Sequence, residues 1–313
     1  MKKISIVSPT YNEESNIVAL HTTIKDITDK LNYDFEFIYI DNKSTDNTRE
    51  KLLSLAKKDK SVKLIFNTRN FGHIRSPYYG ITQATGDAVI YLASDFQDPP
   101  NLIPEFIENW EDGYKLVSAV RKTTESKSYI LNKLRFIYYK LLNYISDVEI
   151  VPNSTGFGLY DKCIIDQIRE INDPYPFLRG LVAYMGYSYK KVYFTQPKRK
   201  NGVTKNNFNT LFDIGLLGIV SHSKIPLRIF SIFGFVVSFL SIISGLVILF
   251  LKIFFWDYFP MGIAPILIVT FFLFGFLSLG LGILGEYIGV VLTYSQKRPI
   301  VIEEERINFD KII

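Results

Sequence analysis

Cysteine is almost absent from this chain of 313 residues, since Cys163 is the only one. A single cysteine excludes an intrachain disulfide and is typical of a protein in a reducing compartment. The three histidines, His21, His73 and His222, are too far apart in the sequence to predict a metal cluster. A secretory signal peptide is not visible either, because Met1 and two lysines lead directly into an apolar, strand-like run.

Two common nucleotide-binding signatures are also missing. No G-x-G-x-x-G follows the first predicted strand and no Walker lysine motif occurs, so an ordinary dinucleotide-binding or P-loop domain is not indicated. The net charge of +5 is modest, and no basic helix interleaved with aromatic residues argues for nucleic acid. The basic residues gather near the apolar C-terminal part, where they suit anionic lipid headgroups.

Long apolar runs are present in that C-terminal part. Residues 227–255 are almost entirely apolar, and residues 260–294 form a second run with one acid, Glu286. Each run exceeds the roughly 20 residues needed to cross a hydrocarbon core of about 30 Å. Two buried helices of a soluble domain are the weaker alternative, because runs of this length rarely lack a charged face. The sequence therefore predicts a hairpin of two transmembrane helices, about 227–254 and 262–294.

Basic residues flank these predicted spans on one side. Arg228 stands at the start of the first span and Lys297 and Arg298 follow the second, whereas the connection has only Lys252 nearby. The positive-inside rule then places both termini and the N-terminal domain in the cytoplasm, with the chain in the inner or plasma membrane. Four glycines of the second run provide a small-residue face for close packing of the spans or of several chains, which favours a homo-oligomer. They are Gly280, Gly282, Gly285 and Gly289.

Strand-like and helix-like runs alternate in the N-terminal part. The predicted elements are strands 4–8, 35–40, 62–66, 88–93 and 116–120, and helices 13–31, 45–58 and 74–85. This alternation predicts an α/β fold with a mostly parallel sheet flanked by helices. We assign residues 1–205 to this domain, 206–226 to a juxtamembrane helix, 227–295 to the spans and 296–313 to a cytoplasmic tail.

One predicted helix of the domain has a membrane-surface pattern. Residues 126–145 carry apolar side chains at helical spacing, with the basic side chains largely elsewhere. The pattern is typical of a helix in the membrane interface. An ordinary amphipathic core helix has the same pattern, so both interpretations stay open.

An acidic pair directly follows the predicted strand 88–93. Asp95 and Asp98 stand just past its carboxyl end, where open α/β sheets bind ligands. Carboxylates there suit a metal-bound phosphate, and a simple turn cap is the alternative. Other strand ends suit a nucleotide, since Tyr11 could stack on a base, Glu13 could accept from a ribose hydroxyl and Asp41 from a base N–H. Each alone is ordinary turn chemistry, but several consecutive strand ends of this kind predict one nucleotide site.

The ordered set of motifs resembles glycosyltransferase family two. The motifs are P-T-Y-N-E from Pro9, D-N-K-S-T-D from Asp41, N-F-G from Asn70, A-T-G-D from Ala84 and D-F-Q-D-P-P from Asp95. Within that family the chain is similar to polyisoprenyl-phosphate glycosyltransferases over essentially its whole length. The resemblance implies a GT-A fold and inverting transfer of one sugar from a nucleotide-diphosphate sugar to a polyprenyl phosphate such as undecaprenyl phosphate. A UDP-hexose is the favoured donor, with a GDP-sugar as the second choice.

The resemblance also implies roles for individual residues. The donor-binding residues that it implies are Pro9, Tyr11, Glu13, Asp41, Ser94, Asp95 and Gln97. The residues that it implies beside the reacting groups are Asp95, Arg121, Arg199 and Lys205. For Arg199 and Lys205, a juxtamembrane patch that holds anionic lipid is the alternative interpretation.

Two positions depart from the family pattern. The D-x-D metal motif here has Ala93 in place of its first carboxylate, so Asp95 and Gln97 are expected to hold Mg²⁺ or Mn²⁺ together with the donor diphosphate. Gly156 stands where many relatives carry an acidic residue, which argues against a base there. The phosphate acceptor needs none, because a monoester with a second pKa of about 6 is mostly a dianion at neutral pH.

Two other functions stay open on the sequence. A processive polysaccharide synthase is less favoured, because neither Trp110 nor Trp256 belongs to a Q-x-x-R-W motif and the predicted spans are too few for a polymer channel. A catalytically silent scaffold for a flippase or a partner transferase is suggested by Ala93 and Gly156. The retained acidic and basic residues argue for the enzyme instead.

Overall fold

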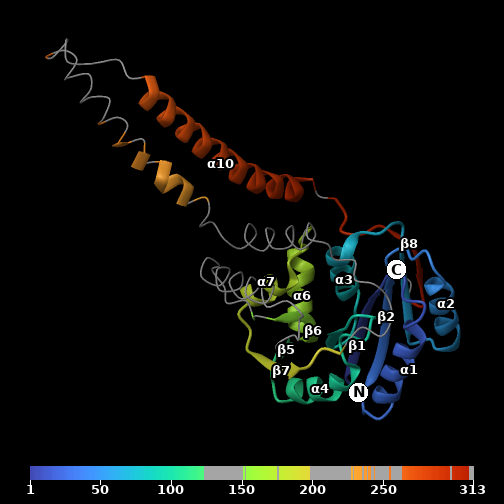
Figure 1. Ribbon diagram of the computed structural model, residues 1–313. Helices are drawn as coiled ribbons and strands as arrows, with labels where there is room; N and C mark the ends of the chain where they lie inside the picture. The colour runs from blue at the N-terminus through green and yellow to red at the C-terminus, as the bar shows by residue number, and fades with distance from the viewer. Residues whose placement is uncertain are drawn as a thin grey trace.

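The computed structural model describes residues 1–122, 151, 153–174, 176–197, 263–296 and 298–309, with scattered positions between 227 and 254. In this part of the chain eight strands form one sheet in the order β7-β5-β6-β4-β1-β2-β3-β8 (Figure 1). The strands are β1 Lys3–Thr10, β2 Asp34–Asp41, β3 Val62–Asn67, β4 Ala88–Tyr91, β5 Leu116–Arg121, β6 Ser154–Asp161, β7 Tyr189–Phe194 and β8 Glu303–Ile307. The helices are α1 Ile17–Thr28, α2 Thr48–Lys58, α3 Gly72–Thr82, α4 Ile103–Glu111, α6 Lys162–Ile171, α7 Leu178–Tyr184 and α10 Ile263–Ser295, with a 3₁₀ turn at Pro100–Leu102.

The sheet is mostly parallel, as predicted. Strands β4, β1, β2 and β3 run side by side in one direction, and β5 is parallel to β7. Strand β6 runs antiparallel between β4 and β5, and β8 runs antiparallel along β3. The carboxyl ends of β1 to β5 and of β7 therefore meet at one edge, together with the amino ends of β6 and β8. That edge is where a ligand of such a sheet binds.

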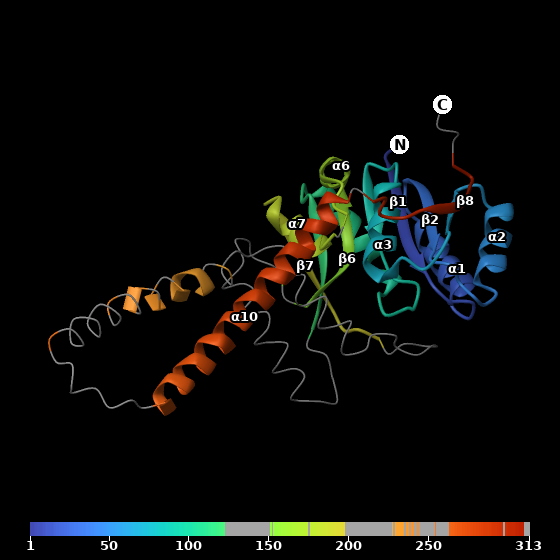
Figure 2. The same ribbon diagram turned by 90° about the horizontal axis from the view of Figure 1, so that it is seen from above.

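Each face of the sheet carries a hydrophobic core under its own helices. Helices α1, α2 and α4 cover one face, with Ile4, Ile6 and Phe106 in the core beneath them. Helices α3, α6 and α7 cover the other face, where Val7 and Ile164 are buried. The two layers are visible in Figures 1 and 2. This two-sided burial explains why the central strands read as nearly continuous apolar runs.

The first two helices begin later than predicted, at Ile17 rather than residue 13 and at Thr48 rather than residue 45. Asn12 adopts a left-handed φ of 58°, which breaks the helical path. The N–H of the next residue, Glu13, donates to the Thr48 hydroxyl instead of starting a helix (2.9 Å). The residues between each strand and its helix are thus used for contacts between loops.

The C-terminal residues are not a separate tail. Strand β8 adds to the sheet beside β3, and Ile300 and Val301 are buried in the core under α3 and α6. Arg49 of α2 forms ion pairs with Glu304 and Glu305 of this strand (3.3 and 2.6 Å). The prediction of a tail over residues 296–313 was therefore wrong for 300–307, because the strand forms through pairing partners far away in the sequence.

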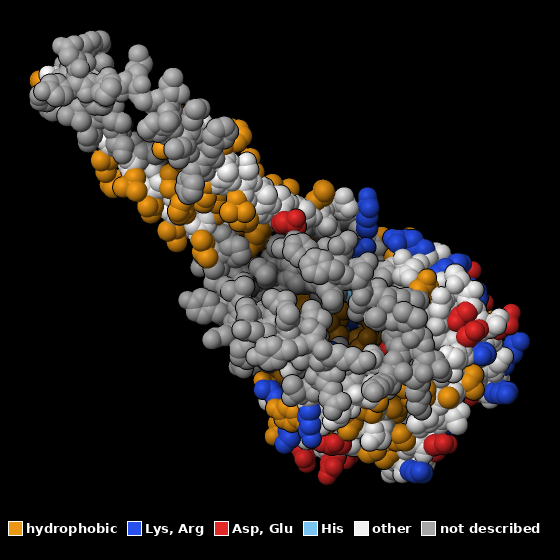
Figure 3. Space-filling model, in the orientation of Figure 1, with side chains coloured by type: hydrophobic (Ala, Val, Ile, Leu, Met, Phe, Trp, Pro, Cys, Tyr) orange, Lys and Arg blue, Asp and Glu red, His pale blue; other side chains and the backbone are white. Residues whose placement is uncertain are grey.

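Helix α10 projects from this body. Within the described residues one helix is long and apolar enough to cross a membrane, at Leu273–Ser295, with a mean hydropathy of 1.8. Hydrophobic side chains gather along this projection, while charged side chains gather over the globular end (Figure 3). The described positions of the first apolar run are helical, and Phe230 and Phe233 contact Phe276 of α10 with ring centroids 5.1 and 4.2 Å apart. Most of that run lies outside the described residues, so the two-helix hairpin stays a prediction.

Candidate functional site

The loops after β1 and β2 hold each other through hydrogen bonds. The Asn12 N–H donates to Ser44 Oγ, and the Asn12 side-chain oxygen accepts from the Thr45 N–H (2.9 and 2.8 Å). Two residues after Asn12, the Glu14 N–H donates to the Asp46 carboxylate (3.3 Å). Because each loop supplies the other with partners, their shared surface is fixed before any ligand binds, which favours binding through preorganisation.

Asn42 connects the second of these loops to the loop after β3. Its side-chain amide donates to Asn70 Oδ1 and to the Gly72 carbonyl (2.9 and 3.1 Å). Its side-chain oxygen accepts from the Asn67 amide and the Phe71 N–H (3.0 and 2.9 Å). Asn42 is 6% exposed, so these four bonds replace water for a nearly buried amide. The three loops after β1, β2 and β3 therefore form one unit, which we call the donor loops because the sequence predicts that a nucleotide donor binds there.

Asp41 lies at the centre of the donor loops. Its carboxylate accepts hydrogen bonds from the hydroxyl and the N–H of Ser44 (2.5 and 3.1 Å) and lies 3.5 Å from the Thr10 hydroxyl. Burial raises the pKa of Asp41, and the bonds from Ser44 oppose that rise. A nearly buried acceptor at the end of β2 suits the recognition of an N–H group on a ligand.

The loop after β4 brings the predicted phosphate site next to β1. Ser94 donates to the Pro9 carbonyl (2.7 Å) and lies 2.9 Å from the Ser8 hydroxyl. Asp95 accepts from the Gln97 N–H (3.1 Å), across Phe96, which has a left-handed φ of 59°. A non-glycine residue in that conformation is strained and often marks a functional loop. The strained turn directs two oxygen-bearing side chains, Asp95 and Gln97, from one short segment.

Asp98 is, like Asp95, a buried acid of this loop. It is 4% exposed and accepts a hydrogen bond from the Ala93 N–H (2.9 Å). Burial raises the pKa of Asp98 to about 7; the Asp95 charge adds to the rise, and the Ala93 N–H and the Arg121 charge oppose it. Arg121 is therefore near this loop, and its guanidinium also donates to Gln196 (2.8 Å), just past β7. Residues 92–99, which we call the acidic loop, and Arg121 therefore meet at the same sheet edge.

The residues of this loop fit a metal ion only if a ligand completes its shell. Among the described residues no three His, Cys, Asp or Glu side chains come together as a metal site. Asp95 and Gln97 offer two oxygens, and Mg²⁺ commonly uses one or two carboxylates with phosphates and water as its other ligands. Ala93, where the D-x-D pattern has a carboxylate, offers no third oxygen. This donor set suits an ion that arrives with a diphosphate.

The structure brings most of the predicted site residues to one edge. Those that lie there are Pro9, Tyr11, Glu13, Asp41, Ser94, Asp95, Gln97 and Arg121. Arg199, Lys205, the predicted interfacial helix 126–145 and the juxtamembrane helix 206–226 lie outside the described residues. Sequence reasoning missed Asn42 as the residue that joins the loops, although it lies in a motif quoted for the resemblance.

More than half of the chain matches a known protein family. The family model described as Glycosyl transferase family 2 matches residues 5–169, which hold the donor loops, the acidic loop and strands β1 to β6. The chain belongs to glycosyltransferase family 2. The sheet is GT-A-like, as the sequence predicted, and the protein is a glycosyltransferase.

Relatives in this family match over nearly the full length. The prophage bactoprenol glucosyl transferase homolog of Escherichia coli K12 is 33% identical over 297 residues, covering 95% of this chain and 97% of the relative. The bactoprenol glucosyl transferase of Shigella phage SfV is 32% identical over 306 residues, covering 97% and 99%. Among solved structures, glucosyl-3-phosphoglycerate synthase from Mycobacterium tuberculosis aligns with a TM-score of 0.48 at 18% identity, covering 70% of this chain and 78% of that one.

Proposed function

We propose that this glycosyltransferase moves a single sugar from a UDP-hexose to a polyprenyl phosphate such as undecaprenyl phosphate, with inversion, at the cytoplasmic face of the membrane. The observation that carries the proposal is the identity of 32–33% with two bactoprenol glucosyl transferases over at least 95% of this chain. That match includes the apolar C-terminal part as well as the catalytic sheet. A lipid acceptor is consistent with an apolar helix that belongs to the same chain as the catalytic sheet.

The fold supports a location at the membrane on the cytoplasmic side. The chain leaves the sheet after β7 and returns to it as β8, directly after α10. If α10 crosses the bilayer, an even number of crossings is required for both ends to reach the same sheet. Together with the basic residues that flank the apolar runs, this supports the multi-pass hairpin with the catalytic domain inside.

The reaction that follows from this site is a direct displacement. An oxygen of the lipid phosphate dianion forms a bond to the anomeric carbon, while the bond from that carbon to the nucleotide diphosphate breaks and UDP leaves with the electron pair. Asp41 and the donor loops hold the nucleoside, and the loop that contains Asp95 positions the diphosphate. Arg121 stabilises the negative charge that builds on the leaving group. Arg199 and Lys205, three and nine residues past Gln196, are proposed to assist it.

Asp95 and Gln97 are the residues that would hold a divalent cation, Mg²⁺ or Mn²⁺. When bound, the ion would neutralise charge on the diphosphate as a Lewis acid. The described residues contribute by holding the lipid phosphate oxygen, the anomeric carbon and the leaving diphosphate oxygen in line. Such alignment alone contributes several kcal/mol in reactions of this kind. Asp98 stabilises the acidic loop by accepting a hydrogen bond from the Ala93 N–H (2.9 Å).

The test is release of nucleotide by the purified full-length protein in detergent. We expect release from one UDP-sugar of a broad donor panel, dependent on added undecaprenyl phosphate, and none by an Asp95→Asn variant. A silent scaffold would bind donors without turnover. No turnover with any donor in the presence of the lipid would contradict the proposed function.

A further inference from the structure

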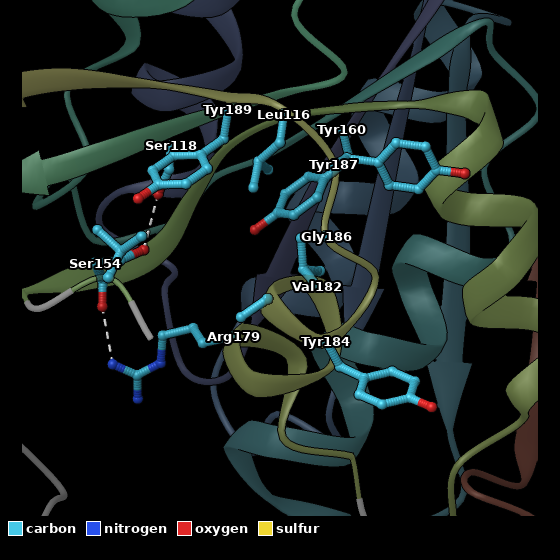
Figure 4. A pocket seen from close by; sticks show the side chains of 12 residues that line it. Leu116, Ser118, Ser154, Tyr160, Arg179, Val182, Tyr184, Gly186, Tyr187 and Tyr189 are labelled. Atoms are coloured by element: carbon cyan, nitrogen blue, oxygen red, sulfur yellow. Dashed lines mark hydrogen bonds between the residues drawn. The ribbon is translucent and has the colours of Figure 1, made fainter. Parts of the chain in front are cut away.

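A cavity of about 390 Å³ lies beside the candidate site, under helix α7. It is lined by strands β5, β6 and β7 as well as by α7, and four of its lining residues are tyrosines. Figure 4 shows the Tyr187 hydroxyl directed into the space, with Leu116 and Val182 on its walls. We call it the tyrosine cavity. Its volume is within the range of about 300–1,000 Å³ that is usual for sites of small ligands.

One cation lines this otherwise mostly uncharged cavity. The guanidinium of Arg179 donates to the Ser154 carbonyl (2.8 Å), and Ser154 Oγ lies 2.9 Å from Ser118 Oγ on the neighbouring strand (Figure 4). Aliphatic and aromatic walls with one guanidinium suit a ligand that has a hydrocarbon body and an anionic end. Arginine is especially suited to phosphate because its planar fork matches the phosphate oxygens.

The cavity also borders the reacting end of the sheet. Ser154, which lines it, is the first residue of β6 and pairs with Val120 near the carboxyl end of β5. The charge of Arg179, also in the lining, acts on Tyr91 at the carboxyl end of β4. A second hollow of about 400 Å³ shares Val151 with the cavity and is lined by Arg121 and two lysines. These lysines are Lys122 and Lys191. Arg121, whose charge acts on Asp98 of the acidic loop, therefore lines a hollow that adjoins the cavity.

The order of the strands separates this cavity from the donor loops. The donor loops follow β1, β2 and β3, the acidic loop follows β4, and the cavity lies on β6, β5 and β7, on the other side of β4. A donor that reaches from the donor loops to the acidic loop leaves its sugar facing β6. An acceptor must then approach from the side of the cavity.

The face of the sheet indicates what kind of acceptor fits. Tyr160 and Val182 belong to the core under α3, α6 and α7, and so do Ile300 and Val301, which follow α10 directly. The cavity and the base of the apolar helix thus share one face of the sheet. A ligand that comes from a membrane along α10 reaches this face without crossing the sheet.

We propose that the tyrosine cavity holds the first prenyl units of the lipid acceptor, with its phosphate at the rim between Arg179 and Arg121. This assignment rests on the proposed function and adds the acceptor subsite to it. A free phosphate would contact only the arginines at the rim, whereas the prenyl units of a prenyl phosphate also contact the apolar walls of the cavity.

Two substitutions test the assignment in the full-length protein with a fifteen-carbon prenyl phosphate as the probe. Ala183→Trp fills the cavity from α7, and Arg179→Gln removes the cation at its rim. We expect both to raise the half-saturating concentration of prenyl phosphate at least tenfold in transfer assays, with that of the UDP-sugar changed less than twofold. Two variants are matched controls: Val18→Trp on α1, which covers the opposite face of the sheet, and Lys190→Gln at an exposed position of β7. Both should keep the wild-type half-saturating concentration of prenyl phosphate.

Binding separates this assignment from the proposed function. Calorimetry on an Asp95→Asn background measures prenyl phosphate binding without turnover, and inorganic phosphate is the headgroup control. We expect the prenyl phosphate to bind and Ala183→Trp to weaken it, with tighter binding than inorganic phosphate. If Ala183→Trp lowers the melting temperature, Arg179→Lys, which keeps the charge but loses the planar fork, replaces it. Binding unchanged by these variants, no binding of the probe, or an effect on the donor alone would overturn the assignment. Binding at the cavity without any transfer by wild type would contradict only the proposed transfer.

Discussion

The strands β1, β2 and β3 end in loops that hydrogen-bond one another, whereas β5, β6 and β7 border two hollows. On the donor side, Asn42 alone makes four hydrogen bonds across two loops. On the other side, the tyrosine cavity has about 390 Å³ of open space and mostly apolar walls. The first half is thus polar and tied together by hydrogen bonds, which suits the nucleotide of our proposal, whereas the second is open and apolar, which suits a prenyl chain.

The two halves also differ in how they are tied to the rest of the chain. The donor side is joined to the strand that follows the apolar helix, through Lys43 and Arg49 on Glu304. The side with β5, β6 and β7, which our proposal assigns to the acceptor and which we call the acceptor side, continues at Gln196 toward the residues before the first predicted span. Both halves are thus connected to the apolar C-terminal part, by different segments. The difference predicts separate effects on donor and acceptor binding when either half is changed.

The largest effect is expected at the acidic loop between the two halves. Asp95→Asn keeps the size of the side chain but removes the charge that we assign to the diphosphate and its ion. We expect transfer to fall by at least about 1,000-fold, at the upper end of losses seen when one electrostatic contact of a transition state is removed. The melting temperature serves as the control and should stay near wild type. An active Asp95→Asn enzyme would contradict the assigned role.

The stability of the strands that carry the donor loops can be tested at Glu36, near the amino end of β2. This side chain is 2% exposed, pairs with Lys63 (2.7 Å) and Lys3 (3.0 Å), and accepts from the Ser5 hydroxyl (2.5 Å). Burial raises its pKa, but the hydrogen bonds from Lys63, Ser5, Thr85 and Lys3 outweigh burial and lower the pKa to about 2. A lowered folded-state pKa contributes stability that is present above the unfolded value of about 4.5 and is lost as pH falls toward 2.

We therefore expect Glu36→Gln to lower the free energy of unfolding by about 3 kcal/mol at pH 7, the usual order for breaking a buried ion pair. The difference from wild type should shrink between pH 4.5 and pH 2. Denaturant titrations at several pH values measure it. A difference independent of pH would show that lost packing, rather than the charge, is responsible.

The metal assignment can be sharpened by restoring the missing carboxylate. Ala93 is half-buried at the start of the acidic loop, so Ala93→Asp adds a ligand beside Asp95. We expect the affinity for Mn²⁺ in the absence of donor to rise at least about tenfold, because carboxylate count governs the strength of such sites. Calorimetry without donor is the measurement. Full wild-type activity in excess chelator would show that basic residues alone neutralise the leaving group.

The smallest effect is expected where the C-terminal strand meets the donor loops. Lys43 has a left-handed φ of 64° and pairs with Glu304 (2.5 Å) at an exposed position. Exposed pairs contribute about 0–1 kcal/mol, so Glu304→Lys should raise the half-saturating donor concentration about two- to fivefold. The swap with Lys43→Glu should restore it and leave acceptor dependence unchanged. Additive losses in the double variant would argue against a direct coupling.

Strands of the donor side could be predicted from the sequence because each is a buried apolar run followed by polar turn residues. The runs at β1 to β4 fall within two residues of the predicted ends, and Asp41 and Asp95 lie at strand ends as expected. Here local composition and final environment agree, since strands covered on both faces are apolar throughout.

The acceptor side and the C-terminal strand could not be predicted in the same way. Strand β6 contains Gly156 and Gly158, both at positive φ, and these weaken its strand pattern. Strand β8 begins with three glutamates, which have low strand propensity, and it forms because β3 and Arg49 are beside it. The cavity brings together Tyr160 of β6, Arg179 of α7 and Tyr187 of the connection between α7 and β7, and no sequence spacing encodes that contact.

The central claim is that one sugar is transferred to a prenyl phosphate, and the mass of the lipid product tests it most directly. The full-length protein is incubated with its UDP-sugar and undecaprenyl phosphate, and the mass of the extracted lipid is measured by mass spectrometry. We predict one new species, heavier than the lipid phosphate by a single hexose residue, and its absence with Asp95→Asn. A ladder of longer products, or unchanged lipid beside released UDP, would contradict it.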